Sequence, residues 1–399
     1  MIQRPLRDCL RGPWRAVPVL GITQIVAWGT IFYSPVLTAP LIAHERGWSL
    51  AFAMGGFSLG LLVAGLVSPT VGRSIDRYDG HAVMTAGSLA SALGLLCLVH
   101  ASHPLAYLAV WALIGAGLAA SLYDAAFATL GRIFGAGARS PITILTLAGG
   151  FASTIGWPAT HLLIGSVGWR GTYLVYAALL ALVCAPLHAF GLPRTHAVAE
   201  TKTGSPAGAP PPRLSPHGAV FALVASAFAS YAFVPSALSA HLLAIFGRTG
   251  IDSATVVLIG TLFGPAQVAA RVCEFMFARN LHPLAIVRGA VLLLIAAFAL
   301  LAIAGFSITT AAAFAIMFGA ANGLITIARG AVPLALFGAA GYGRVIGRIA
   351  GPSLIMQAMA PFVLAFAIER LSDPAALVLA AGFTLLAFAC FAAIRRPRS

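Results

Sequence analysis

Long apolar segments recur along almost the whole chain, from about Val17 to Ile394, and they constrain its fold more than any other feature. Each segment is close to the roughly 20 residues that a helix needs to cross about 30 Å of hydrocarbon. Segments such as 290–305 do not alternate apolar and polar residues, as the strands of a transmembrane barrel do. The segments therefore predict an all-α, polytopic membrane protein.

The amino-acid composition excludes an ordinary soluble enzyme. Of the 399 residues, 60% are hydrophobic and 9% are charged, whereas a soluble domain has about 25% charged residues. The formal net charge of +14 suits a nucleic-acid partner, but the basic residues lie at the ends of apolar segments and not on a soluble face. We expect the partners to be the lipid bilayer and a small solute, with no nucleic acid, and the protein to be a monomer.

No motif indicates a cofactor or a metal site. None of the five cysteines forms a CxxC pair, and Walker A and HExxH sequences are missing. These observations disfavour ATP-driven pumping and membrane-embedded hydrolysis. We expect no enzymatic activity, no cofactor and no metal, and a membrane enzyme or receptor is only a remote alternative.

Charged and Gly/Pro-rich interruptions divide the chain into twelve spans. Their expected limits are 17–43, 50–72, 82–102, 105–131, 142–166, 171–192, 217–243, 253–276, 283–304, 307–333, 351–369 and 374–394. The segment 193–216 is rich in Pro, Gly and Ser, a composition that cannot pack a core. We therefore predict six-helix bundles at 1–192 and 217–399, joined by a cytoplasmic linker at 193–216.

Basic residues fall mainly on one side of the predicted spans. When successive loops are assigned alternately to the two sides of the membrane, 20 Lys and Arg lie on the side of the two termini and the linker. Only four lie on the opposite side: Arg46, Arg170, Arg248 and Arg370. Loops rich in Lys and Arg stay in the cytoplasm. Both termini are therefore expected to be cytoplasmic.

The two halves show signs of duplication. A shift of 203 residues lays the Phe-Gly-Ala sequence at 134–136 on that at 337–339, and Pro158 on Pro361. The same shift lays the first span on the seventh and the fourth on the tenth. Parallel repeats related by an axis along the membrane normal are the plan of one large class of secondary transporters. The sequence thus predicts two bundles related by pseudo-two-fold symmetry.

The loop between the second and third spans resembles the signature of the major facilitator superfamily, G-x-x-x-D-R-x-G. Gly72, Asp76 and Arg77 match it, while Asp79 stands where the next Gly belongs. After the eighth span, Glu274 is the counterpart of the acid. The resemblance implies the twelve-helix major facilitator fold and alternating access, with Gly72, Asp76 and Arg77 forming a gating loop that latches the cytoplasmic ends together.

Shorter motifs resemble two branches of this superfamily. The sequences ERGWS (45–49), GWR (168–170) and QVAAR (267–271) are similar to the monocarboxylate and oxalate/formate transporter branch, which often has an acid where Gln267 stands. The segments 23–30, 122–135 and 321–338 resemble bacterial permeases, some of which are labelled arsenite efflux carriers. These resemblances imply a transporter in the inner membrane of a bacterium.

Three charged residues inside the spans are candidates for substrate binding and coupling. An ionisable group inside a membrane is costly, so it normally faces a cavity or a partner. Asp124 is the only acid well inside a span, and Arg271 and Arg329 are its natural counter-charges. We expect Asp124 and Arg329 to pair across the two halves, with Arg271 as the alternative partner. Two cations against one anion favour an anionic substrate, because a guanidinium grips carboxylates bidentately.

Further polar and aromatic side chains are candidates to line the solute path, since they lie on the first, fourth, seventh, eighth and tenth spans. They are Gln24, Trp28, Thr30, Tyr33, Tyr123, Ser230, Gln267, Asn322 and Thr326. Interhelical packing is the ordinary role of such residues. Together they predict a secondary active transporter of a small organic anion, coupled to protons. Efflux of arsenite or another metalloid, or of amphipathic drugs, is the alternative.

Overall fold

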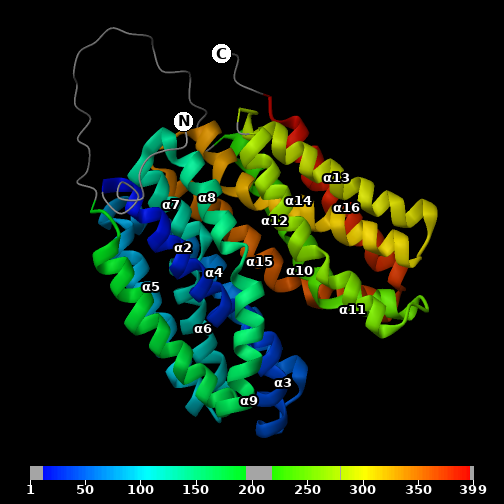
Figure 1. Ribbon diagram of the computed structural model, residues 1–399, viewed down its shortest axis with the longest axis horizontal. Helices are drawn as coiled ribbons and strands as arrows, with labels where there is room; N and C mark the ends of the chain where they lie inside the picture. Colours follow the sequence, from blue (N-terminus) through cyan, green and yellow to red (C-terminus); the bar gives the residue numbers. More distant parts are fainter. Residues whose placement is uncertain (1–11, 195–217, 279, 396–399) are drawn as a thin grey trace.

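The computed structural model describes residues 12–194, 218–278 and 280–395. In this part of the chain all regular structure is helical, and Figure 1 shows two groups of helices. The first group contains α2 (Ala16–Ala27), α3 (Pro35–Arg46), α4 (Leu50–Tyr78), α5 (Gly80–His100), α6 (Pro104–Ser121), α7 (Tyr123–Phe134), α8 (Arg139–Gly149) and α9 (Ala152–Leu179). The second contains α10 (Ala219–Arg248), α11 (Ser253–Thr261), α12 (Phe263–Cys273), α13 (Pro283–Ala304), α14 (Ile308–Phe337), α15 (Tyr342–Arg370) and α16 (Asp373–Ala393).

Short 3₁₀-helices and π-helices connect several of these helices. They are η1 (Gly12–Arg15), η2 (Trp28–Tyr33), η3 (Gly135–Ala138), η4 (Leu180–Cys184), η5 (Leu187–Gly191) and η6 (Glu274–Ala278). Wider turns inside helices are frequent at functional sites. Here η2 carries two of the aromatic residues that the sequence singles out, Trp28 and Tyr33.

Ten helical stretches of the described residues are long and apolar enough to cross a membrane. The longest, Pro104–Gly191, comprises three spans, because η3 interrupts it and Gly168 has a left-handed φ of 70°. The predicted twelve-helix fold is therefore confirmed.

Two of the predicted spans are too short, and both lack residues at the same end of the molecule. The second span was expected at 50–72 and the eleventh at 351–369, but α4 continues to Tyr78 and α15 begins at Tyr342. Glycines and arginines made these segments resemble loops. In the structure they are helix ends that pack against each other. The linker boundaries stay a prediction, since residues 195–217 lie outside the described part.

Each group of helices has its own apolar core. One cluster of buried side chains, including Tyr107, Trp111 and Phe127, lies almost entirely in the first group. A second, including Phe314 and Phe318, lies in the second group. Separate cores allow the two groups to move as units, as alternating access requires.

Two ion pairs support the internal repeat. Arg170 lies 2.5 Å from Glu45, and Arg248 lies 2.7 Å from Asp373. The 203-residue shift maps Glu45 onto Arg248 and Arg170 onto Asp373. The two bundles thus use equivalent positions for the same contact, with the charges exchanged.

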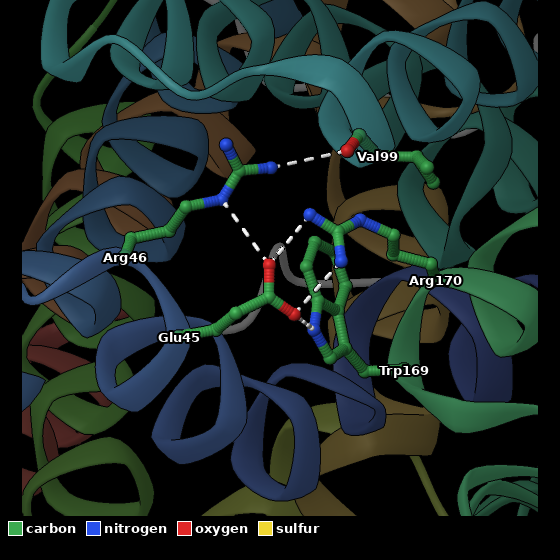
Figure 2. A network of polar contacts seen from close by, with 5 residues as sticks. All are labelled: Glu45, Arg46, Val99, Trp169 and Arg170. Atoms are coloured by element: carbon green, nitrogen blue, oxygen red, sulfur yellow. Dashed lines mark hydrogen bonds and ion pairs between the residues drawn. The ribbon is translucent and has the colours of Figure 1, made fainter.

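The first of these pairs belongs to a wider network at the end of α3 (Figure 2). The Trp169 indole donates a hydrogen bond of 2.7 Å to Glu45, and Arg46 donates one of 3.1 Å to the Val99 carbonyl. The motifs ERGWS and GWR therefore meet in space. In this chain they join the first span to the start of the sixth.

The two groups of helices converge at one end and diverge at the other (Figure 1). They converge where α4 ends and α15 begins, and α3 and α11 lie at the diverging end. The Gly72 backbone approaches Gly343 so closely that a Cβ at Gly72 would lie 2.0 Å from the Gly343 carbonyl oxygen. Glycine is required here because no side chain fits.

Candidate functional site

The fourth span is broken at Leu122, immediately before the membrane acid. Leu122 has an extended backbone (φ −89°, ψ −168°) between α6 and α7. The Gln24 amide donates a hydrogen bond of 2.6 Å to the Ser121 carbonyl at this break and accepts one of 3.1 Å from the Trp28 indole. Asp124 consequently lies in the first turn of α7, where the helix dipole favours a negative charge.

Asp124 and Arg329 form an ion pair between the two halves. Arg329 Nη2 of α14 lies 2.8 Å from Asp124 Oδ2 of α7, and both side chains are mostly buried. This pairing was predicted, and the alternative pairing of Asp124 with Arg271 does not occur. Asp124 Oδ1 and Arg329 Nε are buried without hydrogen-bond partners in the described structure. The pair is therefore a single contact and not a bidentate one.

Arg271 of α12 is a buried cation, 1% exposed. Its guanidinium donates to two backbone carbonyls, Thr146 in α8 at 2.5 Å and Gly323 in α14 at 3.3 Å. None of the ion pairs in the described part of the chain includes Arg271. A buried positive charge thus has neutral carbonyl acceptors from both halves.

A polar row connects α10, α12 and α14 near Arg271. Asn322 donates to Gln267 at 3.2 Å and accepts from the Tyr231 hydroxyl at 2.7 Å. Thr326 donates to the Asn322 carbonyl at 2.8 Å. Tyr231 is absent from the sequence-based candidates.

Aromatic rings of the first half pack around Trp28. The Trp28 ring centre is 5.1 Å from that of Tyr123 and 5.9 Å from that of Tyr33. These three residues are partly exposed, although they belong to interior helices. In contrast, Thr30 and Ser230 are buried, and the Thr30 hydroxyl bonds the Ala27 carbonyl of its own helix. The structure thus groups the predicted aromatic residues in the first half and the polar row in the second half, and it places Thr30 and Ser230 among buried side chains.

Asp76 joins the halves at the converging end. Its carboxylate accepts hydrogen bonds from the backbone N–H groups of Gly343 at 2.9 Å and Arg344 at 2.7 Å, in the first turn of α15. The residue before α15 is Gly341, which has no side chain to cap the helix. Asp76 therefore caps α15 from the other half of the protein.

The rest of the gating loop differs from the prediction for Arg77. Its guanidinium lies 5.0 Å from the ring centre of Tyr78, its own neighbour. Arg132 of α7 is the cation that binds the loop, through the Asp79 carboxylate and the Asp76 carbonyl. Asp79 has a left-handed φ of 72°. The superfamily signature has Gly at this position, where the conformation costs an ordinary residue free energy.

A second contact closes the opposite edge of the same end. Arg139 at the start of α8 donates to Glu274 at 3.0 Å and to the Leu281 carbonyl at 2.7 Å. Glu274 is buried, 3% exposed. Glu274 therefore contacts the first half at this edge, while Asp76 contacts the second half at the other.

Two helical bundles that meet at one end are the architecture of one large class of secondary membrane transporters. Residues 19–348 match the sequence model of the Major Facilitator Superfamily. The chain belongs to the Major Facilitator Superfamily and is an integral membrane protein that takes a small-molecule substrate. Among curated protein sequences, none matches the chain.

Solved structures show the same fold at low sequence identity. The human organic anion transporter MFSD10 (TETRAN) is 17% identical, with a TM-score of 0.72 over 98% of this chain and 100% of that one. The transporter FucP in the outward conformation is 13% identical, with a TM-score of 0.72 over 94% and 97%. A variant of the E. coli fucose:proton symporter FucP is also 13% identical, with a TM-score of 0.73 over 96% and 99%.

Proposed function

We propose that the protein is a proton-coupled secondary active transporter of a small organic anion. The observation that carries this proposal is the buried guanidinium of Arg271, which belongs to none of the ion pairs of the described residues and is held by backbone carbonyls of both halves. A buried cation is stable only when an anion or strong acceptors compensate its charge. A carboxylate substrate supplies that compensation and gains charge-assisted hydrogen bonds.

The likeness to an organic anion transporter supports the same substrate class. So do the motifs that resemble the monocarboxylate and oxalate/formate branch. Gln267 replaces the acid of that branch and bonds Asn322. Because Gln267 is uncharged, no carboxylate lies one turn before Arg271 on α12 to repel a bound anion.

The conformation is outward-facing if the termini are cytoplasmic, as the distribution of Lys and Arg predicts. The latched end, with Asp76 and Glu274, is then the cytoplasmic one in a bacterial inner membrane. A solute reaches Arg271 from the diverging end. Opening of the latches and closure of the outer ends deliver it to the other side.

Asp124 is the proposed proton site. Its bond to Arg329 ties α7 to α14 across the halves, so protonation of the carboxylate removes the charge attraction that closes this end. The second oxygen, Oδ1, is buried and unbonded, and it is the atom available to receive the proton. Neutralising one partner leaves a buried, uncompensated Arg329 that a substrate anion can stabilise.

Proteoliposomes that enclose a pH-sensitive dye test the proposal. Addition of a transported carboxylate is expected to change the internal pH with the wild-type protein and not with Arg271→Gln. Arg170→Gln, which changes an exposed arginine at the diverging end, is the matched control and should behave as wild type. Movement of arsenite or an amphipathic drug, with no response to any carboxylate, favours the efflux alternative and contradicts the proposal.

A further inference from the structure

A pocket of about 740 Å³ lies at the converging end, apart from the central site. It is lined by Pro69, Arg73, Phe221, Ala225, Arg344, Arg348 and Pro352, from α4, α10 and α15. Nothing in the transport mechanism above uses it. We propose that it binds an anionic phospholipid, with the lipid phosphate held by the three arginines.

The arginines give the pocket a strong positive charge. Arg73 and Arg344 take part in none of the ion pairs of the described residues, and Arg73 bonds only the neutral Thr70 hydroxyl, at 3.1 Å. The Arg348 guanidinium lies 4.4 Å from the ring centre of Phe221, which orients it. Guanidinium groups bind phosphate oxygens bidentately.

The lining also changes from basic to apolar with depth. On α15, Pro352 lies one turn beyond Arg348, and on α4, Pro69 lies one turn beyond Arg73. Ala225 likewise lies one turn further into α10 than Phe221. Basic side chains at the membrane surface above apolar residues in the hydrocarbon match a phospholipid, with its headgroup above its acyl chain. A free anion makes no use of the apolar part.

The pocket bridges the two halves. Arg73 belongs to the first half, and Arg344 and Arg348 belong to the second. A phosphate that contacts all three requires α4 and α15 to be packed as they are here. The bound lipid therefore stabilises this conformation over one in which the two helices have separated.

Native mass spectrometry of the full chain with dioleoylphosphatidylglycerol tests the proposal. The combined variant Arg73→Gln, Arg344→Gln, Arg348→Gln is expected to bind this lipid at least about tenfold less well, since each arginine near a phosphate contributes about 1 kcal/mol. The backbone N–H of residue 344 is retained, so the contact with Asp76 survives. Arg77→Gln removes a neighbouring arginine outside the pocket and should leave binding within about twofold of wild type.

Ala225→Phe fills the apolar part without changing the charge, so it separates lipid binding from general loss of positive charge. It is also expected to reduce binding, and dioleoylphosphatidylcholine should bind weakly to every form. Thermal unfolding with inorganic phosphate is the last arm. Unchanged phosphatidylglycerol binding in both pocket variants would overturn the proposal. So would a rise in Tm with inorganic phosphate alone that equals the rise with phosphatidylglycerol.

Discussion

Arg329 donates its hydrogen bond to Asp124 across the boundary between two separately packed bundles, at a distance of 2.8 Å. The two residues are 205 positions apart in the chain, on α7 and α14. Each has a second polar atom, Asp124 Oδ1 and Arg329 Nε, buried without a partner in the described structure. Separation of the halves therefore breaks one hydrogen bond and leaves two buried charges that need other partners.

The first prediction concerns this pair. Asp124→Asn and Arg329→Gln should each lower the Tm, since removal of one partner from a buried pair costs on the order of 3 kcal/mol. The double variant should recover stability, because no uncompensated charge remains. Proton-driven accumulation should be lost wherever Asp124 is replaced, while exchange of substrate across the membrane should persist. Full proton-driven transport by the double variant would show that the pair is only a latch.

The second prediction concerns the packing of α4 against α15. Gly72→Ala should reduce the transport rate and the Tm, because its Cβ would lie 2.0 Å from the Gly343 carbonyl oxygen and would force the helices apart. Gly55→Ala, on the same helix, has open space around the added atom. It should raise the stability slightly, by about 0.5–1 kcal/mol. Equal behaviour of the two variants in thermal unfolding would contradict the role of this contact.

The third prediction concerns the backbone at Asp79, which combines a left-handed φ with a bond to Arg132. Asp79→Gly should be less destabilising than Asp79→Ala, although both lose the carboxylate. Glycine adopts this conformation without cost, whereas a Cβ costs about 1 kcal/mol or more. Thermal unfolding of the two variants measures the difference. A lower Tm for Asp79→Gly than for Asp79→Ala is the result that this account does not allow.

The fourth prediction compares the two equivalent ion pairs. Glu45 accepts the bond of the buried Trp169 indole besides pairing with Arg170, whereas Asp373 pairs with Arg248. High salt should remove most of the cost of Asp373→Ala, because exposed pairs are screened. Glu45→Ala should keep a residual cost of about 1 kcal/mol from the unbonded indole. In a Trp169→Phe background this residual should vanish, and its persistence there would refute the explanation.

The number of spans and the pairing of Asp124 with Arg329 could be predicted from the sequence. Apolar length determines spanning segments, and a lone membrane acid needs a counter-charge. The choice of Arg329 over Arg271 followed from the equivalent places of the fourth and tenth spans in the repeat.

Other contacts were not predictable because they depend on the approach of backbones. Asp76 caps α15 through backbone N–H groups. Apart from Gly343, the residue types at the start of α15 therefore do not indicate this contact. The contact of Arg132 with the loop could not be predicted, since only the packed structure shows which arginine reaches it. Tyr231 was missed because a single tyrosine in an apolar helix is ordinarily a packing residue.

The most direct test of the central claim is substrate binding by Arg271. A thermal-shift screen of the purified protein against carboxylates, metalloids and amphipathic drugs should show at least one carboxylate that raises the Tm of the wild type. That carboxylate should have no effect on Arg271→Gln and a weaker effect on Arg271→Lys, which keeps the charge without the planar, bidentate guanidinium. The account is contradicted if no carboxylate binds, or if the carboxylate that binds the wild type stabilises Arg271→Gln equally.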